Sequence, residues 1–294
     1  MENDQNIPIT RPQTIVGGPP IARQPSMSQP NPINPVAANK PQNTFPTETI
    51  GLPSEGHFYP EGHPLSGGQI EIKMMTAREE DILTNQNLIK KGIVLDKLLE
   101  SLIVTPCKLD DLLTGDKNAV FFAARRLAYG DAYGPVKVTC PKCQTECDRR
   151  IDLSLMQSKD VDLTQYPKGQ NEFEFTFPYT KKTIKYKLLT HRDEGLIDTE
   201  LKAMAKLNKN GSSEVTTRLR YMILSVDGNA DKTAIKRFVE QELPSRDSLA
   251  FRTHVREHSP DLDMGFDFSC DECGNEERMQ VPLTAQFFWP DAGR

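Results

Sequence analysis

The stretches VKVTCPKCQTECDRRIDL, residues 136–153, and GFDFSCDECGNEERMQVPL, residues 265–283, decide the fold of this chain. Each stretch holds one CxxC pair between short runs of strand-forming residues: Cys140 with Cys143, and Cys270 with Cys273. Each is therefore predicted to form a β-hairpin whose tight turn presents two thiols on the same side. Gly274, directly after the second pair, can adopt the positive φ that such a turn needs.

Two such turns placed face to face supply four sulfur ligands, which is the closed tetrahedral set of a structural zinc site. The predicted ligands of one zinc ion per chain are Cys140, Cys143, Cys270 and Cys273. The spacing is unusual, because 126 residues separate Cys143 from Cys270, whereas a compact zinc ribbon uses roughly 15 to 20. The intervening segment must therefore leave the ribbon and return to it.

The cysteines also allow other interpretations. A redox CxxC motif would begin a helix after a strand, where the helix dipole lowers a thiol pKa, and neither pair has that setting. A disulfide is an alternative in an oxidising compartment, but the chain opens without the pattern of a signal sequence. Cys147 could replace one ligand, although a strand cysteine beside the site is the simpler interpretation. Cys107 is expected to be a packed small hydrophobe.

Composition places a disordered segment before the folded part. Hydrophobic residues make up 37% of the 294 residues, and ten of the 22 prolines fall within residues 1–46, which lack apolar periodicity. The expected domains are a disordered Pro/Asn/Gln-rich arm at 1–46, a turn-rich loop with a short strand and a helical unit at 47–134, and a zinc-ribbon-like domain at 135–294. No apolar run reaches the roughly 18 residues of a membrane helix, so no membrane contact is expected.

Periodicity predicts the elements around the two hairpins. In order, the pattern indicates a strand at 69–74, a helix opened by the capping box of Thr76 and Glu79, a helix from about Leu88 to Ile103, a helix at about 116–129, a hairpin at 173–188, and helices from Arg192 to Ser259. The hairpin is expected to extend the sheet of the ribbon. It and the helices after it form an insertion at about 171–259, with Ile223 and Val226 on a helix and Ser245 as a helix cap. The predicted fold class is α+β.

Two other functions are alternatives to a structural zinc protein. The segment HVREH matches the HxxEH pattern of zinc peptidases, with His254 and His258 as ligands and Glu257 as base. Pro260 cuts this helix, and the pattern needs a further ligand, so a peptidase is the weaker interpretation. A nucleic-acid-binding ribbon would need basic and aromatic interleaving beyond Arg149, Arg150 and Arg278, and the net charge of −5 offers no basic block.

Five blocks of the sequence resemble a known family. They are LPSEGHFYPEGHPLSGGQIEIKMMTAREEDIL, CPKC, LPSRDSLAFRTHVREHSPDLDM, CDECG and the terminal FFWPD, spread over roughly residues 50–294. In order and type they are similar to the baseplate hub and hub-assembly proteins of contractile-tailed bacteriophages of the T-even kind. The resemblance implies a non-enzymatic protein that is a component or an assembly factor of the central hub. It implies other hub proteins as partners and no catalytic residues.

The expected location follows from that resemblance. It is the host cytoplasm during assembly and the tail baseplate of the virion afterwards. The predicted protein has a core cross-linked by a metal ion, several amphipathic helices and a disordered arm. These features suit an interaction protein better than an enzyme.

Overall fold

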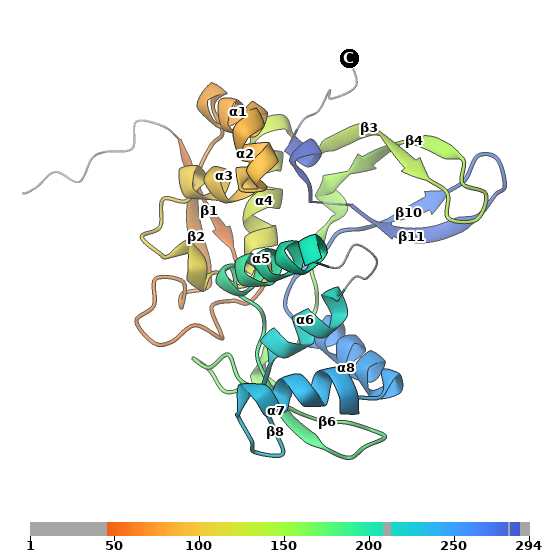
Figure 1. Cartoon of the computed structure of the whole chain (residues 1–294). Helices are drawn as coiled ribbons and strands as arrows, with labels where there is room; N and C mark the ends of the chain where they lie inside the picture. Colours follow the sequence, from red (N-terminus) through yellow and green to blue (C-terminus); the bar gives the residue numbers. More distant parts are fainter. Residues whose placement is uncertain (1–45, 208–212, 282, 289–294) are drawn as a thin grey trace, which may run out of the picture. The chain divides into compact units, whose positions relative to one another are not determined.

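The computed structural model describes residues 46–207, 213–281 and 283–288 (Figure 1). These residues form eight α-helices and five small antiparallel sheets, which confirms the predicted mixture of helix and strand. The disordered arm expected at 1–46 lies outside the described residues except for Pro46. The domain boundaries expected from the sequence stay a prediction.

The helices are α1 (Ala77–Thr84), α2 (Gln86–Lys91), α3 (Val94–Leu102), α4 (Thr114–Tyr129), α5 (His191–Leu207), α6 (Glu214–Met222), α7 (Lys232–Arg237) and α8 (Ser245–His258). The sheets pair β1 (Thr47–Gly51) with β2 (Gln69–Lys73), β3 (Ala132–Thr139) with β4 (Glu146–Asp152), β5 (Gln157–Ser158) with β9 (Leu262–Asp263), and β10 (Gly265–Ser269) with β11 (Glu276–Gln280). The fifth sheet has the order β6 (Phe173–Thr176), β7 (Thr183–Tyr186) and β8 (Ile223–Val226). Shorter elements are η1 (Leu109–Asp111), η2 (Leu153–Leu155), η3 (Leu163–Gln165), the π-helix η4 (Phe238–Glu242) and η5 (Ala285–Phe288).

The loop between β1 and β2 is fixed to α4 by one buried carboxylate. Asp116 accepts hydrogen bonds from the Ser54 amide at 3.0 Å, the Ser54 hydroxyl at 2.6 Å and the Tyr59 hydroxyl at 2.7 Å. Burial raises the pKa of Asp116 although these bonds oppose the shift. The sequence predicts a turn-rich loop here, but nothing in the loop's own residues predicts that Ser54 binds a side chain 62 residues later in the chain.

The helical unit begins and ends where the sequence predicts. Thr76 and Glu79 form the capping box of α1, and α4 ends at Gly130, where φ is +77°. The helix expected between Leu88 and Ile103 is instead two helices, α2 and α3. Gly92 between them adopts a left-handed φ of +71°, which ends α2 and turns the chain.

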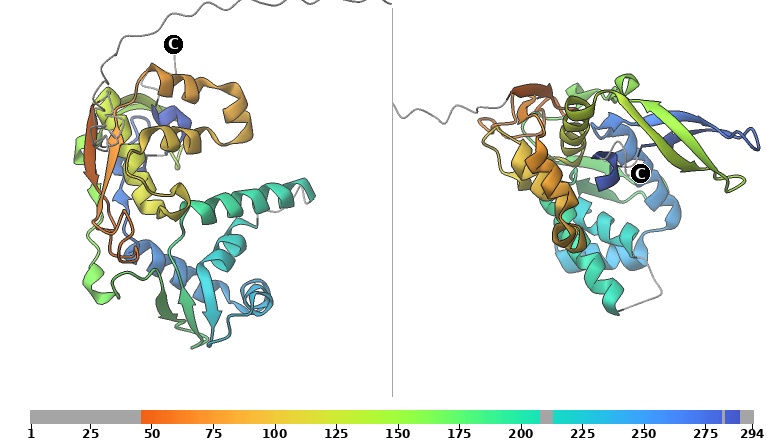
Figure 2. Two further views of the ribbon diagram at one scale, coloured as in Figure 1. Left: turned by 90° about the vertical axis from the view of Figure 1, so that its left-hand side faces the viewer. Right: turned by 90° about the horizontal axis from the view of Figure 1, so that it is seen from above.

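The two cysteine hairpins, β3–β4 and β10–β11, lie side by side (Figures 1 and 2). They remain two separate two-stranded sheets. In addition, β5 and β9 pair antiparallel, with Gln157 opposite Asp263. The chain segments that carry the two hairpins are therefore joined by backbone pairing as well as at the turns.

In the segment between the cysteine pairs, the structure differs from three predictions. The hairpin β6–β7 does not extend the ribbon, because β7 pairs with β8 instead. Residues 223–226 form that strand and not a helix, although Ile223 and Val226 fit a helical period. Ser245 is the first residue of α8 and makes no capping hydrogen bond with its side chain, so the helix begins after Pro244 without a side-chain cap.

Two groups of buried side chains hold the described residues together. The main core draws on the helices, the three-stranded sheet and the final η5, including Phe287 and Phe288. A second, small core lies between the cysteine hairpins. Arg125 of α4 is fully buried and donates to the carbonyl oxygens of Phe287 at 3.0 Å, Gly130 at 3.3 Å and Ala132 at 3.2 Å. This guanidinium ties α4 to the start of β3 and to η5.

Candidate metal centre

The two CxxC turns have the same backbone conformation. In the first, the Cys140 amide donates to the Thr145 carbonyl at 2.9 Å; in the second, the Cys270 amide donates to the Asn275 carbonyl at 2.9 Å. The residue after each second cysteine adopts a left-handed conformation, with φ of +62° at Gln144 and +63° at Gly274. Gly274 thus has the expected positive φ. Gln144 has a Cβ, so its residue type does not predict the same conformation.

The structure brings the four predicted ligands together. The Sγ atoms of Cys140 and Cys273 are 3.7 Å apart, those of Cys143 and Cys270 are 3.6 Å apart, and all four lie within 4.8 Å of one another. A zinc ion with four Zn–S bonds of about 2.3 Å needs sulfurs about 3.8 Å apart. The donor set and its spacing therefore fit a tetrahedral metal ion. No other group of three or more Cys, His, Asp or Glu side chains with such spacing occurs in the part of the chain that the structure describes.

The centre is half enclosed by its own small core. Cys140 and Cys270 are buried, Cys273 is half-buried and Cys143 is exposed. Phe268 is 1% exposed and packs with Cys140, Cys147 and Cys270. So few buried side chains give the tips of the hairpins little hydrophobic stabilisation, and a metal ion would supply the missing connection.

Local contacts move the pKa values of two of these thiols in opposite directions. The hydroxyl and backbone amide of Thr145 lower the pKa of Cys143 to about 6. The backbone amide of Asn275 opposes a rise at Cys273, but burial and the neighbouring thiols raise its pKa to about 12. Without a nearby cation, the Cys273 thiol therefore favours its protonated form at neutral pH. A divalent cation supplies the positive charge that four thiolates require.

Residues around the cluster connect the two turns. The Arg149 guanidinium of β4 pairs with Asp271 at 2.8 Å, donates to the Ser269 carbonyl, and lies 5.3 Å from the centre of the Phe268 ring. Cys147 is buried with its Sγ 3.9 Å from that of Cys270. The sequence identifies Cys147 as a neighbour of the centre, whereas the bridging position of Arg149 depends on a contact across 122 residues.

The HVREH segment lies on α8 and does not assemble a second metal site. The Nε2 atom of His254 is 2.9 Å from the Tyr186 hydroxyl, and the rings of His254 and His258 are 4.1 Å apart. Glu257 is exposed. Within the described ranges, no third ligand lies near the two histidines, so the geometry does not support the peptidase interpretation.

The basic residues weighed for nucleic-acid binding are largely paired. Arg149 pairs with Asp271, and Arg278 pairs with Asp263 at 2.8 Å and Asp267 at 3.5 Å. These carboxylates cancel the charge that phosphate contacts would use. Of these three arginines, only Arg150 has no ion pair with a residue that the structure describes, and it is exposed.

The remaining expectations concern Cys107 and the membrane. Cys107 is half-buried and packs against the main core, and burial raises its pKa, as expected for a packed thiol. None of the helices in the described ranges combines the length and the apolar character needed to cross a bilayer.

Comparison with known proteins adds one finding. Residues 51–289 match a family model described as T4 bacteriophage base plate protein. No curated protein and no solved structure matches the chain. The match spans both cysteine pairs, the helical unit and the segment between the pairs.

Proposed function

Because the chain belongs to the family of the T4 bacteriophage base plate protein, we propose that it is a structural protein of the central hub of a phage tail baseplate. It acts there as a component or an assembly factor, through contacts with other hub proteins. The family match over residues 51–289 is the observation that carries this proposal. A location in the tail of the virion follows from it, preceded by assembly in the host cytoplasm.

The arrangement of side chains favours a structural role over catalysis. The most concentrated chemistry in the described residues is the four-thiol cluster, and four sulfurs around one ion leave no coordination position for a substrate or a water. The histidines of α8 are engaged with Tyr186 and with each other. We therefore assign no catalytic residue.

We further propose that the cluster binds one structural zinc ion in a zinc-ribbon-like pair of hairpins. Cys140, Cys143, Cys270 and Cys273 would hold the ion, and Cys147 would lie beside it without coordinating. When bound, the ion neutralises the thiolates and cross-links the two turns. Arg149 orients the second turn through Asp271, as a residue outside the coordination sphere often does.

The test is to follow the chain through tail assembly. A phage carrying a deletion of its gene is complemented with the wild-type chain, and mass spectrometry is applied to purified assembly intermediates and to mature particles. We expect failed tail assembly without the chain and its presence in baseplate intermediates with it. Presence in mature particles distinguishes a component from an assembly factor. Normal tails in its absence would refute the proposal.

A matched pair of variants separates the zinc proposal from the hub proposal. Cys273→Ser removes one predicted ligand, whereas Cys107→Ser changes a thiol that packs on the main core. We expect the first to lose bound zinc and to assemble poorly, and the second to keep both properties. Equal zinc content in the two variants, measured by elemental analysis under reducing conditions, would refute the ligand assignment and leave the hub proposal standing.

A further inference from the structure

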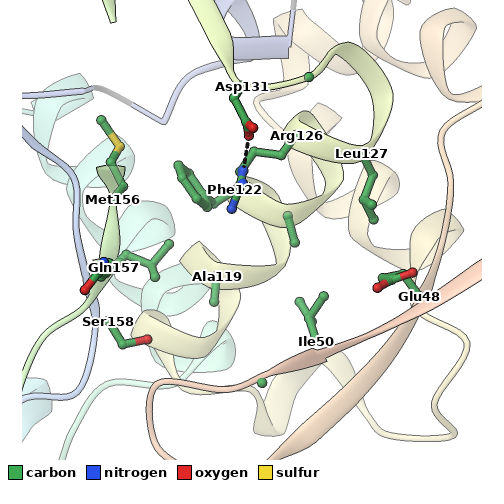
Figure 3. A pocket seen from close by; sticks show the side chains of 14 residues that line it. Glu48, Ile50, Ala119, Phe122, Arg126, Leu127, Asp131, Met156, Gln157 and Ser158 are labelled. Atoms are coloured by element: carbon green, nitrogen blue, oxygen red, sulfur yellow. Dashed lines mark hydrogen bonds and ion pairs between the residues drawn. The ribbon is translucent and has the colours of Figure 1, made fainter. Parts of the chain in front are cut away.

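A groove of about 540 Å³ lies between β1, α4 and β5 (Figure 3). We call it the β1 groove and define it by Glu48, Ile50 and Gly51 of β1, Ala119 and Ala123 of α4, and Ser158 of β5. Figure 3 shows α4 as its floor, with Glu48 and Ile50 on one side and Ser158 on the other. Its size lies within the roughly 300–1,000 Å³ of typical binding clefts.

The backbone of β1 directs unused hydrogen-bonding groups away from β2. The Leu52 amide donates to the Gly68 carbonyl at 2.8 Å, and the Met74 amide donates to the Pro46 carbonyl at 3.2 Å, so both ends of the ladder are hydrogen-bonded pairs. In an antiparallel ladder such pairs alternate with residues whose amides and carbonyls point outward. In β1, the residues whose backbone amides and carbonyls point away from β2 are Thr47, Thr49 and Gly51.

The other edge of the same sheet shows what a covered edge looks like. Glu71 of β2 points outward by the same alternation, and its carbonyl accepts from the Val104 amide at 2.9 Å while its amide donates to the Thr105 hydroxyl at 2.7 Å. No corresponding hydrogen bond reaches the outward groups of Thr49 or Gly51 from any residue that the structure describes. The outward backbone groups of Glu71 on the β2 edge are therefore hydrogen-bonded, whereas the β1 edge is open.

The open edge carries one charged side chain, Glu48, but lacks the other features within a strand that prevent strand pairing. Proteins usually protect an exposed edge with a lysine, a proline or a bulge inside the strand. The sequence of β1 is TETIG, with none of these, and its five pairs with β2 run without a register shift. Thr49 and Gly51 are exposed. The edge is thus ready to accept a further strand.

We infer that the β1 groove binds an extended segment of another baseplate protein, which adds to β1 as the third strand of its sheet. The inference rests on the proposed function for the identity of the partner. Backbone groups of Thr49 and Gly51 would pair with the segment, which is the strand-addition mode of peptide recognition. The apolar floor at Ala119 and Ala123 takes small or medium aliphatic side chains.

The charge of the groove indicates which side chains the bound segment carries. Asp131 at the groove is paired with Arg126, so their charges cancel, whereas the exposed Glu48 has no ion pair among the described residues. The groove therefore keeps one negative charge. A lysine or arginine in the bound segment, placed opposite Glu48, complements it.

The test uses a proline that blocks the open edge and leaves the native ladder intact. Thr49→Pro removes an amide hydrogen that β2 does not use and places the ring on the open side of the strand, and proline is tolerated on strand edges. Thr49→Val keeps the amide and is the matched control. Each baseplate protein of the same phage is purified singly, and its binding to the full chain is measured by calorimetry. We expect Thr49→Pro to weaken binding of one of them by about tenfold or more, and Thr49→Val by less than about twofold.

A second measurement needs no variant. In the free chain the amides of Thr49 and Gly51 should exchange with solvent quickly while those of Glu48 and Ile50 are protected, and all four should be protected in the complex. Protection of Thr49 and Gly51 in the free chain would overturn the inference. Sedimentation would then assign the edge to a second copy if the chain is a dimer, or to the chain's own residues if it is a monomer.

The outcomes also separate this inference from the proposed function. Equal binding by Thr49→Pro and the wild type would refute strand addition, while presence of the chain in tail intermediates would still support the hub role. Absence of the chain from intermediates would refute the hub role. If the wild type binds no baseplate protein, the inference is wrong as well.

Discussion

At the scale of single residues, Cys147 lies next to the thiol cluster without being one of its predicted ligands. Its Sγ is 3.9 Å from that of Cys270, and it sits in the strand β4 and not in a turn. We predict that Cys270→Ser abolishes stoichiometric zinc binding and that Cys147→Ser retains about one zinc per chain. Elemental analysis of both variants, purified side by side, checks this. Loss of zinc from Cys147→Ser would show that Cys147 is a ligand, and retention of zinc by Cys270→Ser would refute the assignment of Cys270.

A second prediction at this scale concerns Glu79, whose side chain is fully buried. Burial alone would raise its pKa, but hydrogen bonds from Lys73 at 2.7 Å, Ser101 at 2.5 Å and Thr76 outweigh it and lower the pKa to about 2. The charged form is therefore favoured in the folded state. Its contribution to the free energy of unfolding is complete above about pH 4.5, the ordinary value, and is lost as the pH falls toward 2.

The expected loss for Glu79 is on the order of 2–3 kcal/mol. Urea unfolding between pH 6 and about pH 2.5 measures it, with Glu79→Gln as the control, because the amide cannot titrate. We expect the control to be less stable at pH 6 and to lose less stability on acidification. Parallel pH profiles for the two proteins would contradict the assignment.

At the scale of elements, the turn between β6 and β7 is held by α8. Asp247 is fully buried and accepts from the Tyr179 amide at 2.9 Å, the Thr180 amide at 2.9 Å and the Thr180 hydroxyl at 2.7 Å. Asp247→Ala is expected to lower the free energy of unfolding by about 2–4 kcal/mol, since three donors lose their acceptor. Glu257→Ala, an exposed position on the same helix, should change it by less than about 0.5 kcal/mol. Equal denaturation midpoints would contradict this.

Elements with local signals were predictable from the sequence. The capping box at Thr76 and the stop at Gly130 act within one turn of a helix, and each CxxC hairpin combines alternation with its own turn residues. The sequence does not predict the strand β8, because Ile223 and Val226 also fit a helical period and only pairing with β7 makes them a strand. The strand β1 was missed because TETIG has no alternation of apolar and polar residues.

The cysteine cluster shows the same division between local and distant signals. Spacing identified the four thiols, since each pair is a local motif. It could not identify Gln144 as a residue with positive φ, or Arg149 as the bridge between the turns. The conformation of Gln144 belongs to the turn itself, and Gln, unlike Gly274, does not signal a positive φ, whereas the Arg149 contact depends on the packing of one hairpin against the other.

At the scale of the whole molecule, the thiol cluster and the main core are separate sources of stability. The main core does not include the CxxC cysteines, and β5–β9 pairing already joins the chain on both sides of the insertion. We predict that a zinc chelator under reducing conditions leaves the helical circular dichroism largely unchanged. Amides at the tips of β3–β4 and β10–β11 should lose protection from hydrogen exchange, while those of α4 keep it.

Two results would contradict this separation. Cooperative loss of protection in α4 on chelation would mean that the metal holds the entire fold. No change at the hairpin tips would mean that the thiols alone, with Phe268, stabilise the turns. The Cys107→Ser variant serves as the control, because its thiol contacts the main core and its response to chelator should equal that of the wild type.

The distance of 126 residues between the two cysteine pairs also has a consequence for biosynthesis. Translation at about 5–20 residues per second means that Cys140 and Cys143 emerge roughly 6 to 25 s before Cys270 can join them. If all four thiols bind one metal ion, the first pair is during that interval an open dithiol on a nascent chain, exposed to oxidation and to other metals. Closure of the centre is thus a late event, and a ribosome that stalls within the insertion leaves a product whose hairpins cannot be cross-linked.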